Sequence, residues 1–288
     1  MSLTTLSDLY EQAKRTGQSL WRVVLLDDVQ ERDVTEAASF ETMRSMYRAM
    51  RDADAAYDGS LRSVSGLAGG DGAILERFRG EDNDLISDFM RNVMAKAVKM
   101  GESNACMRRI VAAPTAGSCG VIPAVLLSYE EQTHAPEDRL VEALFIAAGF
   151  GEVIAKNAGI AGAEGGCQAE MGTASAMAAG ALAYLRGADE EAILHAAAMA
   201  IKNMLGLTCD PVAGLVEVPC IKRNISGAVN AVVCAEMARA GLRSRIPPDE
   251  VVGAMQRIGC MIPASLRETG QDGLAVTPTG LRVRASLK

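Results

Sequence analysis

The sequence predicts an all-α protein, with a single large helical domain whose connecting loops are rich in glycine and proline. Three observations predict this class. Apolar residues recur at steps of three and four in most segments, as on one face of a helix. No segment alternates apolar and polar residues, and no strand–helix–strand rhythm appears. The 288 residues are 49% hydrophobic but only 4% aromatic, with 15 methionines, a composition that suits close packing between helices.

The N-terminal residues carry helix signals. The first twenty residues are polar and helix-like. Ser7 and Asp33 are residue types that often precede a helix, and Asp33 stands three residues before Glu36, the spacing of a capping box. Residues 34–57 place apolar side chains at three- and four-residue steps. They predict an amphipathic helix.

A glycine-rich stretch, SGLAGGDG (65–72), predicts a break in the helical pattern. We expect it to separate an N-terminal helical region (1–64) from the main helical domain (65–288), with the two packed as one unit. The helices expected in the main domain are 83–101 (starting near Asp82–Asn83), 121–132, 138–156, 168–186, 189–205, 226–241 and a last helix starting at Pro247–Pro248–Asp249.

Long connections separate these helices and contain most residues capable of chemistry. They are rich in glycine, proline and asparagine, and are expected at residues 113–120, 156–167, 207–220 and 222–227, with a Gly/Thr-rich tail at 267–280. Catalytic groups are often carried by loops that a rigid scaffold positions. This organisation therefore favours a functional site built from loops.

Charge and composition exclude several classes of protein. The net charge is −7, with Lys and Arg scattered, which argues against a nucleic-acid or anionic-membrane surface. The start of the chain does not resemble a secretory signal. The most apolar run, 173–185, is too short to span a bilayer. We expect a soluble cytoplasmic protein, in which seven cysteines do not form a disulfide framework.

The cysteines fall into two groups. Cys106, Cys234 and Cys260 lie in apolar surroundings and are expected to be buried in the core. Cys119 lies in a glycine-rich loop without a nearby partner of ligand type, and core packing is also expected for it. These four cysteines need no chemical role.

Cys167, Cys209 and Cys220 lie in loop segments instead. Cys167 is expected at the start of a helix, where oriented N–H groups stabilise a thiolate. Cys209 and Cys220 border a segment that prolines keep from becoming helical. Three thiolates can converge on one metal centre. Zinc normally takes a fourth ligand, often histidine, but His134 and His195 lack ligand spacing. Three cysteines favour an iron–sulfur cluster with one open iron, although their spacing matches neither common ferredoxin pattern.

Five long stretches resemble one known family. They are SVSGLAGGD (63–71), RRIVAAPTAGSCGVIP (108–123), AGAEGGCQAEMGTASAMAAGAL (161–182), IKNMLGLTCDPVAGLVEVPCIKRN (201–224) and RETGQDGLAVTPTG (267–280). The chain closely resembles the α subunit of bacterial iron–sulfur-dependent L-serine dehydratases, over nearly its whole length. The resemblance implies a helical cluster-binding catalytic domain at 65–288 and deamination of L-serine to pyruvate and ammonia.

The resemblance also implies the cofactor and its ligands. In this family a [4Fe–4S] cluster is held by three cysteines, which correspond to Cys167, Cys209 and Cys220, and one iron lacks a cysteine ligand. Pyridoxal phosphate is not used. The family's Ser-His-Thr motif, which belongs to a β subunit or β domain, does not occur in these 288 residues. We therefore expect a β subunit to supply the catalytic base, and His195 to be a core histidine with its hydrogen bonds satisfied.

Polar residues in the loops are candidates for binding the carboxylate or amine of the substrate. They are Thr115, Ser118, Asn157, Lys222, Arg223 and Asn224. Thr115 and Ser118 are also suited to capping the helix that follows them. Lys222 and Arg223 are equally explained as a solvated pair at the start of a helix.

Two other functions stay open on the sequence alone. One is a pyridoxal-phosphate amino-acid lyase, with Lys156 or Lys202 forming the Schiff base and a glycine-rich loop holding the phosphate. The other is a non-catalytic iron–sulfur or zinc scaffold, or a thiol redox sensor, that regulates a partner.

Overall fold

Helices make up the fold. The structure is a computed structural model that describes residues 3–78 and 85–287, and within these ranges it contains no β-strand, so the all-α prediction is confirmed. The α-helices of the described residues are α1 (Leu6–Thr16), α2 (Leu20–Arg32), α3 (Glu36–Ala55), α4 (Asp71–Arg77), α5 (Asp88–Ala105), α6 (Val121–Thr133), α7 (Glu137–Ala158), α8 (Gly162–Gly165), α9 (Thr173–Leu185), α10 (Glu190–Met204), α11 (Cys220–Arg239), α12 (Pro248–Met261) and α13 (Pro278–Ser286).

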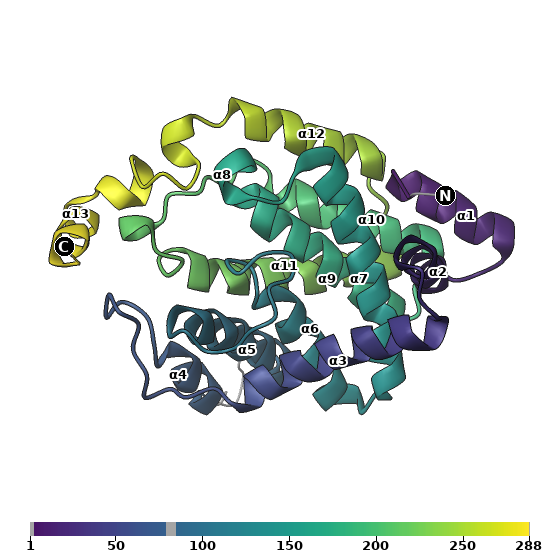
Figure 1. Ribbon diagram of the computed structural model, residues 1–288, viewed down its shortest axis with the longest axis horizontal. Helices are drawn as coiled ribbons and strands as arrows, with labels where there is room; N and C mark the ends of the chain where they lie inside the picture. Colours follow the sequence, from purple (N-terminus) through teal and green to yellow (C-terminus); the bar gives the residue numbers. More distant parts are fainter. Residues whose placement is uncertain (1–2, 79–84, 288) are drawn as a thin grey trace.

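Helix α9 is the centre of the molecule (Figure 1). All of its residues are buried, as expected of a helix that is apolar on every face. It packs against α6, α7, α10 and α11. Small residues allow the close approach: a Cβ atom on Gly180 would lie 2.3 Å from Cε2 of Phe150 in α7. Backbones this close leave no room for a larger side chain.

Most of the expected helices are confirmed. The segments predicted at 34–57, 121–132, 138–156 and 189–205 correspond to α3, α6, α7 and α10. The segment 168–186 corresponds to a π-helical turn, Gln168–Gly172, followed by α9. Helix α12 begins at Pro248, with a proline in its first turn as predicted.

The predicted N-caps are wrong. Ser7 lies inside α1, whose cap is Thr5 in a capping box with Asp8. Asp33 ends α2 in the left-handed conformation, at φ 52°, and the cap of α3 is Thr35. In each case a threonine two residues away accepts the hydrogen bond from the first turn. A cap-type residue therefore did not by itself locate the start of the helix.

Other boundaries also differ from the predictions. Helix α11 starts at Cys220 rather than at 226, so residues 222–227 are helical and not a connection. Helices α4 and α13 fall in regions predicted as a glycine-rich break and a tail. Helix α5 begins at Asp88 after the cap Ser87, whereas the predicted start near Asp82–Asn83 lies outside the described residues.

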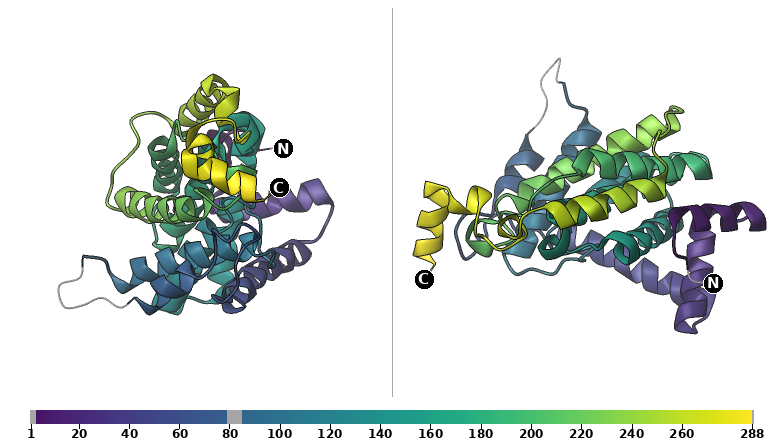
Figure 2. Two further views of the ribbon diagram at one scale, coloured as in Figure 1. Left: turned by 90° about the vertical axis from the view of Figure 1, so that its left-hand side faces the viewer. Right: turned by 90° about the horizontal axis from the view of Figure 1, so that it is seen from above.

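The N-terminal helices share the main core. Leu20 of α2 and Tyr47 of α3 are fully buried, and both belong to the hydrophobic cluster that contains α9. Helices α2 and α3 both pack against α7. The first and last helices, α1 and α13, lie at opposite ends of the long axis (Figure 2). The domain division at residues 64–65 stays a prediction.

None of the described helices combines the length and apolar character that a membrane span requires. Even α9, the most apolar helix, is too short to cross a bilayer. Its apolar faces are covered by neighbouring helices instead.

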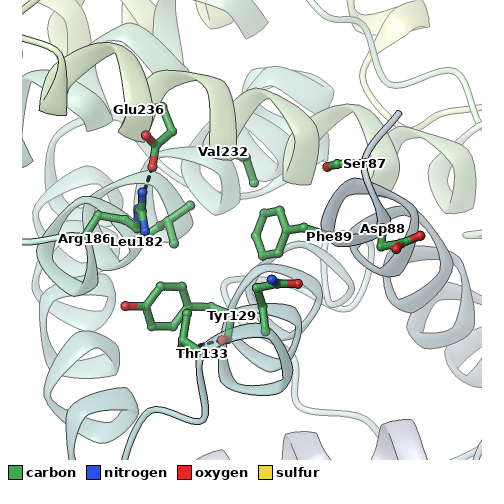
Figure 3. A pocket seen from close by; sticks show the side chains of 10 residues that line it. Ser87, Asp88, Phe89, Tyr129, Thr133, Leu182, Arg186, Val232 and Glu236 are labelled. Atoms are coloured by element: carbon green, nitrogen blue, oxygen red, sulfur yellow. Dashed lines mark hydrogen bonds and ion pairs between the residues drawn. The ribbon is translucent and has the colours of Figure 1, made fainter. Parts of the chain in front are cut away.

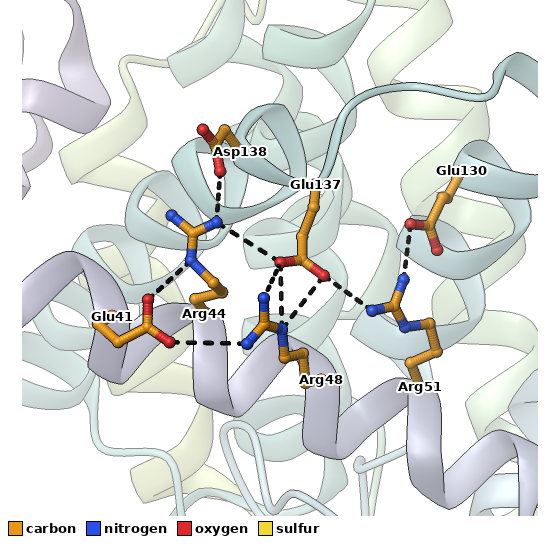
Figure 4. A network of polar contacts seen from close by, with 7 residues as sticks. All are labelled: Glu41, Arg44, Arg48, Arg51, Glu130, Glu137 and Asp138. Atoms are coloured by element: carbon orange, nitrogen blue, oxygen red, sulfur yellow. Dashed lines mark hydrogen bonds and ion pairs between the residues drawn. The ribbon is translucent and has the colours of Figure 1, made fainter.

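An ion-pair network joins α3 to the start of α7 (Figure 4). Three arginines of α3 surround Glu137: Arg48 and Arg51 each approach it at 2.8 Å, and Arg44 at 3.5 Å. Arg44 also pairs with Asp138 at 2.6 Å. The hydrogen bond from Arg48 is the main cause that lowers the pKa of Glu137 below its usual range. The network adds an electrostatic contact to the hydrophobic packing of α3 on α7.

The substitution Glu137→Gln is expected to lower the free energy of unfolding by about 1 kcal/mol at neutral pH, since the network is partly exposed. Because the folded-state pKa is depressed, the carboxylate stabilises the fold above its ordinary pKa of 4.5, and this stabilisation is lost as the pH falls through the folded-state value. Urea unfolding of both proteins between pH 7 and pH 3 checks this. A stability difference that stays constant down to pH 3 would contradict it.

Candidate functional site

Three cysteines from separate segments face one another at a buried site. Cys167 precedes the π-helical turn, Cys209 lies in the connection after α10, and Cys220 is the first residue of α11. All three are buried, with at most 5% of the residue exposed. Ionised Cys167 raises the pKa of both Cys209 and Cys220. The fold thus brings together the three cysteines that the sequence analysis separated from the other four.

Tight turns position Cys167. Gly166 has φ 73°, and a Cβ atom there would lie 2.9 Å from the carbonyl oxygen of Leu207, so only glycine fits this close approach. Gln168, the residue after Cys167, is buried and accepts a hydrogen bond from the Gly206 N–H at 2.9 Å. Its own backbone N–H donates to Leu207 O, also at 2.9 Å. These bonds attach the segment that leads to Cys209 to the start of the π-helical turn.

Backbone hydrogen bonds hold Cys209 against the segment after α12. Its N–H donates to Leu266 O at 2.8 Å, and its carbonyl accepts from the N–H of Glu268 at 2.7 Å. Together they form an isolated parallel bridge between Cys209 and Arg267. The tail predicted at 267–280 therefore starts as a wall of the site. In Figure 1 this wall lies on the side of the bundle that carries α13.

Asn224 attaches α11 to the loop before α6. Its amide nitrogen donates to Gly117 O at 2.9 Å and to Cys220 O at 3.0 Å. Its amide oxygen accepts from the Gly120 N–H at 2.9 Å. Because Asn224 is buried, each of these bonds satisfies a group that water does not reach. The side chain fixes Cys220 relative to this loop.

Burial disfavours ionisation of the three thiols. Burial is the main cause that raises the pKa of all three thiols. The pKa rises to about 11 for Cys167 and to about 12 for Cys220, and the pKa of Cys209 is raised above both. The expected thiolate at the helix start is therefore wrong for Cys167 on its own. Arg223 acts in the opposite direction, because its positive charge lowers the pKa of Cys167. Its guanidinium also donates to Thr208 O at 2.7 Å and pairs with Asp210 at 3.1 Å.

Glu170 is a site residue that the sequence analysis missed. It lies in the π-helical turn and is 8% exposed, and burial is the main cause that raises its pKa. Thr115 donates to its Oε1 at 2.7 Å, and Ser118 lies 3.0 Å from the Thr115 hydroxyl. Thr115 binds Glu170 directly and Ser118 contacts Thr115, and neither hydroxyl caps α6, which has no side-chain cap. The sequence feature that could have identified Glu170 is a single acidic residue in an otherwise apolar stretch.

The donor set fits an iron–sulfur cluster. Metal ligation deprotonates buried thiols and supplies the positive charge that this site lacks. Within the described ranges, one trio of ligand-type groups has all its ligand atoms within 4.8 Å of one another, namely Asp27, Glu31 and Glu152. The three sulfurs therefore do not all lie within 4.8 Å of one another, whereas the ligands of a single zinc ion lie about 3.8 Å apart when the Zn–S bond is about 2.3 Å. A multinuclear centre is the better match.

Two substrate-binding candidates are engaged elsewhere. Asn157, at the end of α7, donates to Thr4 O and Val153 O, both at 2.7 Å. Lys222 is an exposed side chain that pairs with Asp71 at 3.2 Å. Thr115, Ser118, Arg223 and Asn224 line or support the cysteine site. A substrate role for any of the six stays a prediction.

The remaining cysteines lie on other elements. Cys119 and Cys234 are buried as expected. Cys106 is only partly buried, and the prediction of burial is wrong for Cys260, which is exposed on α12. Cys260 lies on the exposed face of an amphipathic helix, next to the exposed Met261.

The two histidines and the two candidate lysines also lie on other elements. His134 ends α6. His195 belongs to α10, and its buried Nδ1 has no hydrogen-bond partner in the described part of the chain, so the expectation of a satisfied core histidine is wrong. Lys156 pairs with Glu152, which raises its pKa, whereas a Schiff-base lysine needs a lowered one. Lys202 lies in the last turn of α10.

A separate apolar pocket of about 450 Å³ lies between α5, α6, α9 and α11. Phe89, Tyr129 and Val232 line it, and an ion pair of 2.8 Å between Arg186 and Glu236 forms one edge (Figure 3). None of the three site cysteines lines this pocket. Its volume alone gives it no chemical role.

The substitution Asn224→Ala is expected to lower the free energy of unfolding by about 2–3 kcal/mol, because it leaves buried backbone groups of Gly117 and Gly120 unpaired. The matched control is Lys222→Ala, two residues away, where an exposed ion pair contributes at most about 0.5 kcal/mol. Urea unfolding of the three proteins measures both effects. Equal stabilities for the two variants would contradict the structural role of Asn224.

Comparison with known proteins identifies the family. Residues 2–275 match the family model described as serine dehydratase alpha chain. The chain is 47% identical over 263 residues to the "Probable L-serine dehydratase, alpha chain" of Bacillus subtilis, covering 89% of this chain and 88% of the relative. It is 39% identical over 284 residues to the L-serine dehydratase alpha chain of Peptoniphilus asaccharolyticus, covering 98% and 97%. An L-serine dehydratase of Streptomyces coelicolor is 38% identical over 276 residues, which are 93% of this chain but 60% of the relative. The chain belongs to the serine dehydratase alpha chain family.

Proposed function

We propose that this chain is the α subunit of an L-serine ammonia-lyase that deaminates L-serine to pyruvate and ammonia, with a [4Fe–4S] cluster held by Cys167, Cys209 and Cys220. The observation that carries the proposal is the convergence of these three buried cysteines from separate segments. The family supports the substrate, because relatives that match nearly the whole chain are named L-serine dehydratase alpha chains.

The cluster, when bound, supplies a Lewis-acidic iron without a cysteine ligand, which promotes departure of the substrate's β-hydroxyl group. The chain's own residues prepare the site for it. Arg223 places a positive charge beside the thiolates, and the hydrogen bonds of Gln168 and Asn224 hold the cysteine segments in place. Loss of the Cα proton and the β-hydroxyl leaves water and aminoacrylate, whose imine form hydrolyses to pyruvate and ammonia.

The catalytic base is proposed to come from a β subunit. His134 and His195 lie on α6 and α10 and are not placed among the site residues described above. The relatives give further support. The chain covers nearly all of the relatives named alpha chain, but 60% of the Streptomyces coelicolor protein named simply L-serine dehydratase. We expect a second functional unit in the part of that relative that this chain does not match.

The ligand set is tested by reconstituting the cluster anaerobically and measuring iron and sulfide. Each of Cys167→Ser, Cys209→Ser and Cys220→Ser is expected to hold less iron and sulfide than the wild-type chain and to lose the broad visible absorption of the cluster. Cys234→Ser is the matched control, because Cys234 is also buried and also lies in α11. A variant that retains the full iron and sulfide content removes its cysteine from the ligand set.

The need for a partner is tested by assaying pyruvate formation anaerobically. The reconstituted chain alone is expected to turn over L-serine slowly or not at all. Adding the β subunit is expected to increase the rate by about 10²- to 10⁴-fold, the usual contribution of general acid–base catalysis. Full activity of the chain alone would rule out a base supplied by the partner. An intact cluster without turnover in the complete assembly would favour a non-catalytic scaffold.

A further inference from the structure

Glu170 presents a carboxylate oxygen to the cysteine site. Its Oε1 accepts the hydrogen bond from Thr115 at 2.7 Å. Its Oε2 accepts no hydrogen bond from any described residue, although Glu170 is 8% exposed. Its charge also raises the pKa of all three site cysteines, so the carboxylate lies close to them. A carboxylate oxygen that lacks a protein partner, on a largely buried side chain, is available to hydrogen-bond a ligand.

Two glycines lie in close contact with this carboxylate. A Cβ atom on Gly117 would lie 2.9 Å from Oε1 of Glu170, and one on Gly162 would lie 2.9 Å from Oε2. The same point above Gly162 is 3.1 Å from the Cys209 sulfur. A side chain at position 162 would therefore collide with Glu170 and Cys209. Glycine at this position lets the carboxylate and the proposed cluster ligand approach the same point of the backbone.

A second carboxylate approaches the same point of the backbone. Oε2 of Glu268 lies 3.3 Å from the point above Gly162, and the charge of Glu268 raises the pKa of Glu170. Glu268 reaches this position because its backbone N–H donates to Cys209 O at 2.7 Å. Unlike Glu170, it is exposed. A buried and an exposed carboxylate thus lie close to each other beside Cys209.

Neither carboxylate has an ion pair among the described residues. The positive charge of Arg223 acts on Glu170, but its guanidinium already binds Asp210, Thr208 and the thiol of Cys167. Two carboxylates this close repel each other, and a cation that contacts both removes the repulsion. An ammonium group is such a cation, since it can donate hydrogen bonds to several carboxylate oxygens at once.

We propose that Glu170, assisted by Glu268, binds the α-ammonium group of L-serine and makes the site selective for an amino acid over a hydroxy acid that lacks the amine. This inference rests on the proposed function and assigns to Glu170 a role in substrate recognition. Thr115 and Ser118 then act as positioning residues, because they orient the Glu170 carboxylate and leave its other oxygen for the substrate.

The test compares two ligands that differ only in the ammonium group, L-serine and 3-hydroxypropionate. It uses the reconstituted assembly of cluster-loaded chain and β subunit. For Glu170→Gln, the KM for L-serine is expected to rise about 10- to 100-fold, the usual range for losing a charged hydrogen bond. The inhibition constant of 3-hydroxypropionate is expected to stay at the wild-type value. Glu268→Gln is expected to raise the KM by a smaller factor, about 3-fold, because that carboxylate is solvated.

Two further measurements do not depend on turnover. Iron and sulfide contents of both variants are expected to equal those of the wild type, since neither glutamate is a proposed cluster ligand. The calorimetric Kd of L-alanine, which carries the ammonium but cannot eliminate, is expected to rise in parallel with the KM. Glu164→Gln is the matched control: it is the same substitution of an exposed side chain in the segment that contains Gly162, and it is expected to behave as the wild type.

Several outcomes would overturn the inference. A wild-type KM in Glu170→Gln would do so, and so would an equal loss of affinity for L-serine and 3-hydroxypropionate. A fall in kcat at constant KM would assign Glu170 to proton transfer instead, and a loss of iron would assign it to holding the cluster. If the wild-type assembly forms no pyruvate, the proposed function fails. Comparing the Kd of L-alanine for the wild type with that for Glu170→Gln then tests the ammonium site independently of turnover.

Discussion

The complete burial of α9 is the constraint on which the rest of the structure depends. A helix that is apolar on every side must be enclosed, and α6, α7, α10 and α11 enclose it. Its alanines and glycines let these helices approach closely. Because the π-helical turn leads directly into α9, the central packing also fixes the position of Cys167. The site is therefore attached to the most rigid part of the molecule.

Buried polar side chains hold the other two cysteines in place relative to this central packing. Gln168 attaches the segment before Cys209, and Asn224 attaches the start of α11, where Cys220 lies, to the loop before α6. Such bonds are strongly directional, and leaving any of them unmade in the interior is costly. They define one arrangement of the three segments, which hydrophobic packing alone does not do.

The electrostatics of the site explain why it needs positively charged ligands. Three buried thiols and the carboxylate of Glu170 share the cation of Arg223. Burial alone favours the protonated thiols, so a metal centre is required to stabilise the thiolates. The proposed ammonium site has the same basis, because the uncompensated carboxylates of Glu170 and Glu268 favour a cationic group. The cofactor and the substrate would each supply positive charge that the protein residues of the site do not.

The sequence by itself determined the helical class, most of the helix positions and the distinction of Cys167, Cys209 and Cys220 from the other cysteines. These follow from periodicity, composition and neighbouring glycines and prolines, which are local properties. Tertiary structure decided where α11 begins, since the bonds of Asn224 make residues 222–227 part of the helix. It also decided that Glu170 and Glu268, 98 positions apart in the numbering, lie close together beside Cys209. Contacts between distant segments depend on packing, which no local pattern encodes.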